Sequence, residues 1–71
     1  MIVYSKDHCQ KCVATTRALD RKGIDYELIK VEPGSEQFQR LQDEGFQSFP
    51  IVKTGDQEWS DFRPDLIAKL V

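Results

Sequence analysis

The chain has 71 residues, of which 39% are hydrophobic and 31% charged, and its ten basic and twelve acidic residues leave a formal net charge of −2. These values are typical of one small globular domain over residues 1–71 and argue against disorder, nucleic-acid binding and attachment to an anionic membrane. The start of the chain lacks a basic region followed by a long apolar segment. We therefore expect neither a signal peptide nor a transmembrane helix, and a cytoplasmic location.

The first half of the chain has the pattern of a strand, a helix and a second strand. Ile2–Tyr4 is apolar without polar alternation, which predicts a central strand covered on both faces. A helical pattern starts at Gln10 and ends where Gly23 can cap it, and a second strand follows at 26–31. A strand, helix and strand in this order normally form a parallel pair with a right-handed crossover.

The second half predicts a helix, a hairpin and a last helix. Ser35 can cap a helix that buries Phe38 and Leu41 and ends at Gly45. Two short strands, 51–54 and 57–60, then surround a tight turn at the edge of the sheet. The last helix is expected to begin at Pro64, because proline suits the first helical position.

Both cysteines lie where the first strand gives way to the first helix, as Cys9-Gln10-Lys11-Cys12. A thiol is a nucleophile only as its thiolate, and the free N–H groups and dipole of a helix start lower thiol pKa. Cys12, one turn further along, would face the same side and can attack a mixed disulfide formed at Cys9. The pair therefore predicts a dithiol/disulfide switch.

Three other interpretations of the cysteines are weaker. So small a disulfide ring would stabilise the fold by at most about 2 kcal/mol. A structural zinc site needs about four ligands, and beyond the cysteines and His8 the chain offers only carboxylates, so we expect no metal site. Buried, inert thiols fit poorly with the basic side chains of Lys6 and Lys11 around them.

The whole chain resembles the thioredoxin fold in its short glutaredoxin form, and three segments most closely resemble the NrdH-type redoxins. These are Tyr4-Ser5-Lys6, Phe49-Pro50-Ile51-Val52, and Trp59-Ser60-Asp61-Phe62-Arg63-Pro64-Asp65, which is similar to the family's Trp-Ser-Gly-Phe-Arg-Pro signature. The resemblance implies an α/β fold of order β-α-β-α-β-β-α, with a four-stranded mixed sheet and three helices.

The resemblance also implies a function and the roles of the site residues. Cys9 would be the attacking and Cys12 the resolving cysteine of a protein-disulfide reductase, a monomeric electron carrier without a bound cofactor. The Phe49–Pro50 peptide would be cis, so that residue 49 presents its backbone to a partner. Electrons would come from NADPH through thioredoxin reductase, a flavoprotein, and pass to ribonucleotide reductase in deoxyribonucleotide synthesis, or to another protein disulfide.

Two alternatives stay open, a glutathione-dependent glutaredoxin and a protein whose thiols hold a metal or an iron–sulfur cluster. Glutaredoxins resembling this chain carry Gly-Gly-Cys-Asp-Asp before the last helix, where acidic side chains and the helix start hold glutathione. The matching stretch here reads Ser60-Asp61-Phe62-Arg63-Pro64, with an apolar ring, a positive charge and one N–H donor fewer. We therefore expect weak glutathione binding.

Two departures from the family pattern bear on partner preference. Asp61 replaces the signature glycine, and aspartate tolerates the left-handed backbone region that such a glycine can require. Lys11 either stabilises the Cys9 thiolate or points into water, Lys6 is a second candidate thiolate partner, and an exposed Phe62 ring would suggest a docking surface. Trp59 either contacts a partner or packs in the hairpin. The full set of expected partner contacts is Lys6, Gln10, Lys11, Phe49, Pro50, Trp59, Ser60, Asp61, Phe62 and Arg63.

Overall fold

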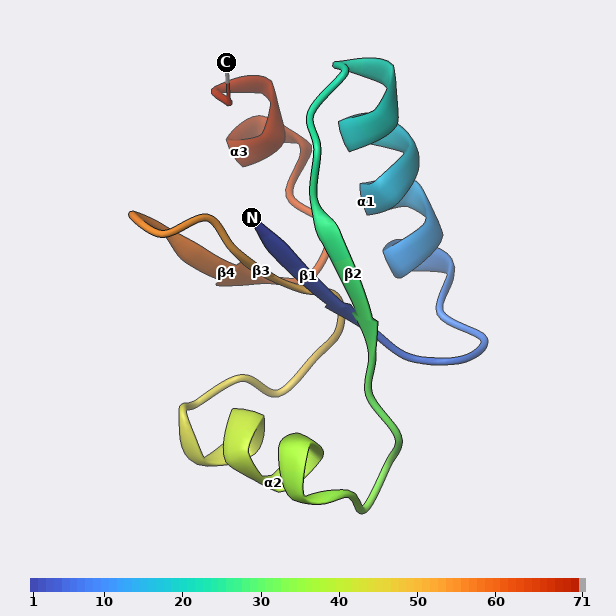
Figure 1. Ribbon diagram of the computed structural model, residues 1–71, viewed down its shortest axis with the longest axis vertical. Coiled ribbons are helices and arrows are strands. Elements are labelled where there is room, and N and C mark those ends of the chain that lie inside the picture. The colour runs from blue at the N-terminus through green and yellow to red at the C-terminus, as the bar shows by residue number, and fades with distance from the viewer. Residues whose placement is uncertain (71) are drawn as a thin grey trace.

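Residues 1–70 are described by a computed structural model, and within them three helices and four strands follow the predicted order (Figure 1). The elements are β1 (Ile2–Ser5), α1 (Gln10–Arg21), β2 (Glu27–Lys30), α2 (Glu36–Asp43), β3 (Ile51–Lys53), β4 (Glu58–Ser60) and α3 (Pro64–Ala68). Val71, the last residue of the predicted domain, lies outside the described residues. None of the helices in residues 1–70 combines the length and the apolar character needed to cross a membrane.

The strands form one mixed sheet in the order β2-β1-β3-β4. β1 is central, as predicted, because it pairs in parallel with β2 and antiparallel with β3. β3 and β4 form the predicted hairpin at the sheet edge, in which Val52 lies opposite Trp59. The expected four-stranded mixed sheet is therefore confirmed.

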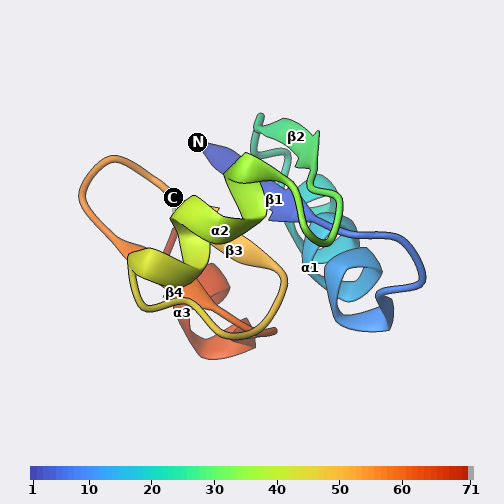
Figure 2. The same cartoon turned by 90° about the horizontal axis from the view of Figure 1, so that it is seen from below.

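Helices cover both faces of the sheet. On one face, Val3 and Val52 pack with Leu19 of α1 and Ile67 of α3. On the other face, Ile51 packs with Leu41 of α2, together with Val31, Phe49 and Cys12. Figures 1 and 2 show α2 on the opposite side of the sheet from α1 and α3. The prediction that β1 is covered on both faces is confirmed.

Local signals in the sequence account for the helix ends. The Ser35 hydroxyl accepts a hydrogen bond from the Phe38 N–H at 3.1 Å, so Ser35 is the N-cap of α2, as predicted. Gly23 follows α1 with φ of 70°, a backbone conformation that suits glycine after a helix end. Pro64 is the first residue of α3, also as predicted.

Lys53 connects the hairpin to α2. Its ammonium lies 3.5 Å from the carboxylate of Glu58, the cross-strand neighbour, and 2.7 Å from that of Glu44. The hydrogen bond that the Lys53 ammonium donates to the Glu44 carboxylate is the main cause of a raised Lys53 pKa. The ammonium also lies over the rings of Tyr4 and Phe46, at 5.8 and 5.7 Å. Lys53 thus joins the C-terminal end of α2 to the sheet that carries the site.

Candidate active site

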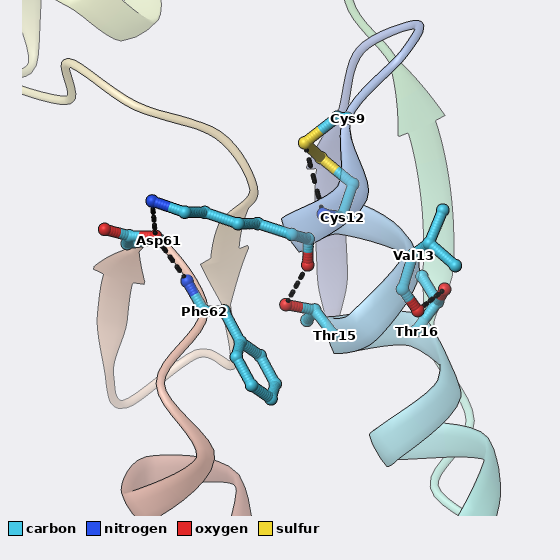
Figure 3. Close-up of a disulfide and its surroundings, with 8 residues drawn as sticks. Cys9, Cys12, Val13, Thr15, Thr16, Asp61 and Phe62 are labelled. Atoms are coloured by element: carbon cyan, nitrogen blue, oxygen red, sulfur yellow. Dashed lines mark hydrogen bonds and ion pairs between the residues drawn. A yellow bond between two sulfur atoms is a disulfide. The ribbon is translucent and has the colours of Figure 1, made fainter.

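Cys9 and Cys12 are joined by a disulfide at the start of α1, with their Cα atoms 5.2 Å apart (Figure 3). Cys9 is the N-cap of the helix, and its sulfur accepts a hydrogen bond from the Cys12 N–H at 3.1 Å. The N–H groups at a helix start lack intrahelical partners, so this position stabilises a negative sulfur when the pair is reduced. The expected placement of both cysteines at the helix start is therefore confirmed.

The two cysteines differ in their access to solvent. Cys12 is 4% exposed and packs with the buried residues on the α2 side of the sheet, whereas Cys9 is only partly buried. An outside sulfur can therefore reach Cys9 more readily than Cys12. This asymmetry suits Cys9 to first attack and Cys12 to an internal second step.

A groove with a volume of about 500 Å³ lies beside the disulfide, between α1, β2 and the loop that joins β1 to α1. Cys9 and Cys12 line it, together with Val13 and Leu28, which are 48% and 54% exposed. The sequence reasoning did not single out these two apolar residues. Only their places in the elements could have indicated that they are exposed. Val13 lies outside the buried stripe of α1, and Leu28 lies on β2, which is an edge strand of the sheet.

The Phe49–Pro50 loop lies next to the cysteines and contains the cis peptide that the resemblance implies. Phe49 and Pro50 are buried, and the Phe49 ring stacks with that of Phe38 at a centroid separation of 6.0 Å. The Lys6 ammonium lies 5.7 Å from the centre of the Phe49 ring. Lys6, expected as a candidate thiolate partner, is thus placed over an aromatic face in the disulfide form.

The loop between β4 and α3 reaches the site through Asp61. The Asp61 N–H donates to the Pro50 carbonyl at 2.8 Å, and the backbone at Asp61 has φ of 73°. The position therefore does require the left-handed conformation inferred from the family glycine, and aspartate adopts it. The Asp61 carboxylate also accepts a hydrogen bond from the Phe62 N–H at 2.8 Å.

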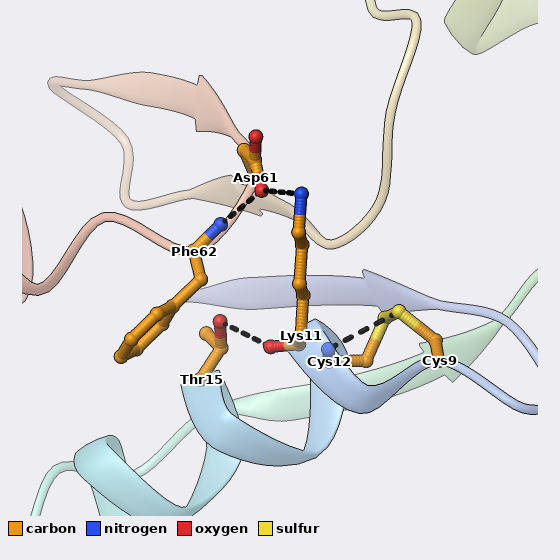
Figure 4. A network of polar contacts seen from close by, with 6 residues as sticks. All are labelled: Cys9, Lys11, Cys12, Thr15, Asp61 and Phe62. Carbon is orange, nitrogen blue, oxygen red and sulfur yellow. Dashed lines mark hydrogen bonds and ion pairs between the residues drawn. A yellow bond between two sulfur atoms is a disulfide. The ribbon is translucent and has the colours of Figure 1, made fainter.

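In the disulfide form, the Lys11 side chain neither extends freely into water nor points toward the sulfur (Figure 4). Its ammonium lies 3.0 Å from the Asp61 carboxylate, so an ion pair joins the turn between the cysteines to the β4–α3 loop (Figure 4). The hydrogen bond from Lys11, with a smaller one from the Phe62 N–H, holds the pKa of Asp61 below its ordinary value of 3.8. The sequence predicted neither this pair nor its position.

The other expected partner contacts in β4 and the β4–α3 loop differ in how far their side chains are exposed. Trp59 is 6% exposed in the core, and its indole N–H has no hydrogen-bond partner within residues 1–70, so hairpin packing fits its side chain better than partner contact. The Phe62 ring is half-buried against the core cluster that includes Leu19 and Ile67, so it does not offer the exposed ring that would have suggested a docking surface (Figure 3). Arg63 is exposed and binds Asp65 through two hydrogen bonds, at 2.9 and 3.2 Å. Ser60 ends β4 opposite Ile51 and is half-buried.

Gln10 is exposed and is the first residue of α1. His8, which precedes Cys9, is also exposed and has φ of 56°. Within residues 1–70, no three His, Cys, Asp or Glu side chains gather in an arrangement that could hold a metal ion. The site around Cys9 thus contains a second sulfur atom, a backbone N–H donor and ion-paired side chains.

Comparison with known proteins places this geometry among redox proteins. Residues 1–59 match the family described as Glutaredoxin. The chain is 41% identical over 68 residues to the Glutaredoxin-like protein NrdH of Escherichia coli strain K12, a match that covers 96% of this chain and 84% of that protein.

The similar solved structures include two redox proteins. NrdH-redoxin from Escherichia coli, described as a glutaredoxin-like protein with a thioredoxin-like activity profile, has a TM-score of 0.91 and 40% identity, covering 99% of this chain and 92% of its own. The glutaredoxin grx-1 from Archaeoglobus fulgidus has a TM-score of 0.75 and 25% identity, covering 97% and 82%.

Proposed function

The chain belongs to the glutaredoxin family and, within it, to the NrdH-type glutaredoxin-like proteins, and on this basis we propose that it is a small electron carrier that reduces protein disulfides. The observation that carries the proposal is the asymmetric cysteine pair at the start of α1. Cys9 caps the helix and is partly accessible, while Cys12 is buried behind it. We assign Cys9 as the attacking cysteine and Cys12 as the resolving one.

The reaction takes two exchange steps. The Cys9 thiolate attacks one sulfur of the partner disulfide, so that a Cys9–partner disulfide forms, the partner S–S bond breaks, and the leaving sulfur takes up a proton. Cys12 then loses its proton and attacks the Cys9 sulfur, which forms the Cys9–Cys12 bond and releases the second partner sulfur, also protonated. The partner has gained two electrons and two protons, and the carrier is oxidised.

Regeneration needs two electrons, for which we propose NADPH and a flavoprotein of the thioredoxin reductase class. The similar Escherichia coli protein is described as having a thioredoxin-like activity profile, which supports this donor. The resemblance to NrdH-type proteins supports ribonucleotide reductase as an acceptor, alongside other protein disulfides. Such a cycle belongs in the cytoplasm, where thiols are kept reduced, and the chain would act there as a monomer.

The β4–α3 loop supports a protein disulfide over glutathione as the substrate. In this loop, the Asp61 carboxylate is already bound to Lys11, and the guanidinium of Arg63 is bound to Asp65. Pro64 offers no N–H at the start of α3, and α3 has only five residues. The charged groups that could hold the two ends of glutathione are therefore occupied or missing.

A coupled assay tests the proposal. NADPH oxidation is followed with thioredoxin reductase and a disulfide-bonded protein, and separately with glutathione, glutathione reductase and a small mixed disulfide of glutathione. We expect turnover in the first system and little in the second, with the Cys9→Ser variant inactive in both. Turnover confined to the glutathione system would overturn the proposed donor and favour a glutaredoxin.

A further inference from the structure

We propose that Asp61 is a positioning residue that holds the Lys11 ammonium away from Cys9, and so keeps the Cys9 thiol less acidic than a free lysine between the two cysteines would make it. The inference deepens the proposed function, because it rests on Cys9 being the attacking thiol. It concerns the ion pair that joins the turn between the cysteines to the β4–α3 loop.

The geometry shows a lysine directed away from the sulfur. Lys11 is the second residue of α1, and its side chain extends from the helix to the β4–α3 loop, with the ammonium at the end remote from the disulfide (Figure 4). The ammonium is 3.0 Å from the Asp61 carboxylate. Without that carboxylate, the flexible lysine stem would leave the charge free to approach a thiolate at Cys9.

Asp61 is held in place independently of Lys11. Its backbone N–H donates to the Pro50 carbonyl at 2.8 Å, and its carboxylate accepts from the Phe62 N–H at 2.8 Å. The acceptor is therefore fixed by its own loop, and the lysine comes to it. Asp61 also has a lowered pKa, so the carboxylate is ionised at the pH at which thiols titrate.

The other charged groups around the site have contacts of their own. Asp7, in the loop before Cys9, pairs with Lys30 of β2 at 2.9 Å. Arg63 pairs with Asp65 at 2.9 Å. Lys6 lies over the Phe49 ring, and His8 is exposed beside Cys9. Separating Lys11 from Asp61 would thus change the field at Cys9 without requiring these groups to move.

The stability of the Cys9 thiolate affects how readily the dithiol gives up its electrons. A nearby free cation stabilises the thiolate, which lowers the thiol pKa, reduces its intrinsic nucleophilicity and makes the reduced dithiol more stable. A more stable dithiol is a weaker reductant. The Lys11–Asp61 pair removes this stabilisation and so favours a dithiol that gives up its electrons.

Two single variants, which should shift the Cys9 pKa in opposite directions, and the double variant test the inference. Asp61→Asn keeps an oxygen for the Phe62 N–H and tolerates the left-handed backbone, yet frees Lys11, so the Cys9 pKa should fall by about 0.3 unit or more. Lys11→Met leaves the Asp61 carboxylate unpaired, so the Cys9 pKa should rise. The double variant should return close to the original value. Asp56→Asn, in the exposed hairpin turn, is the matched control and should change nothing.

The measurement is the pH dependence of Cys9 alkylation by iodoacetamide in the reduced full chain, with the Cys9 peptide quantified by mass spectrometry. A purely structural role would alter unfolding but not produce shifts of opposite sign, so unfolding curves are recorded alongside. Equal pKa values in all variants, or shifts of the same sign in both single variants, would overturn the inference. Alkylation needs no partner protein, so this failure is distinct from a loss of turnover in the coupled assay.

Discussion

His8 and Asp61 shape the two loops around the disulfide at the level of single residues. Both have positive φ, 56° and 73°, although neither is glycine. The left-handed region costs roughly 1–2 kcal/mol for most residues, and histidine, asparagine and aspartate are enriched there. His8 turns the chain into the N-cap at Cys9, and Asp61 turns it toward Lys11.

His8 offers a test of this backbone requirement. His8→Val places a β-branched side chain at positive φ and should lower the free energy of unfolding by about 1–2 kcal/mol. His8→Asn, the matched variant, keeps a residue that tolerates this conformation and should change it by less than about 0.5 kcal/mol. Urea unfolding checks both, and equal values for the two variants would show that the conformation is not required.

Asp61 and Lys11 differ in how far the sequence alone predicts their structure. The left-handed backbone at Asp61 could be predicted, because a family glycine marks positions that need it. The partner of Lys11 could not, because the pair joins a helix start to a loop far along the chain. Local patterns do not encode the distance between two such segments.

At the scale of elements, α2 depends on its cap. Ser35→Ala removes the side-chain acceptor of the Phe38 N–H, and we expect the free energy of unfolding to fall by about 1 kcal/mol. Ser48→Ala, in the loop before Phe49 and outside any helix, is the control and should have a smaller effect. Urea unfolding of the two variants decides, and a larger loss for Ser48→Ala would contradict the capping role.

Local sequence signals predicted the order of the elements, but not which side chains each element buries or pairs with its neighbours. Hydrophobic periodicity, Ser35, Gly23 and Pro64 predicted the helices that the structure contains. The sequence left open whether the Phe62 ring is exposed, and the ring is half-buried because it packs against the core cluster that includes Leu19 of α1 and Ile67 of α3. Lys53 lies opposite Glu58 in the hairpin, and its shorter contact to Glu44 arises from the docking of α2. Such contacts depend on packing between elements.

The whole molecule carries ion pairs that make its stability depend on pH. The pKa of each of Asp7, Asp61 and Asp65 is lowered, chiefly by hydrogen bonds from Lys30, Lys11 and Arg63 in turn. A lowered carboxyl pKa adds stability that is fully present above the unfolded value of about 3.8 and is lost as the pH falls through the folded value.

We therefore predict that the melting temperature falls below about pH 4, and that added salt weakens this dependence because all three pairs are exposed. Thermal unfolding by circular dichroism between pH 6 and pH 2 measures it. Asp65→Asn should lose less on acidification than the unaltered chain, since one pair is already gone. A melting temperature that rises on acidification would contradict the assigned pairs.

Trapping the mixed-disulfide intermediate shows whether Cys9 attacks and Cys12 resolves. Reduced Cys12→Ser protein is mixed with a disulfide-bonded protein substrate and examined by non-reducing electrophoresis and mass spectrometry. We predict a stable mixed disulfide at Cys9, and none with Cys9→Ser under the same conditions. A mixed disulfide that forms at Cys12 in Cys9→Ser as fast as at Cys9 in Cys12→Ser would contradict these roles of the two cysteines.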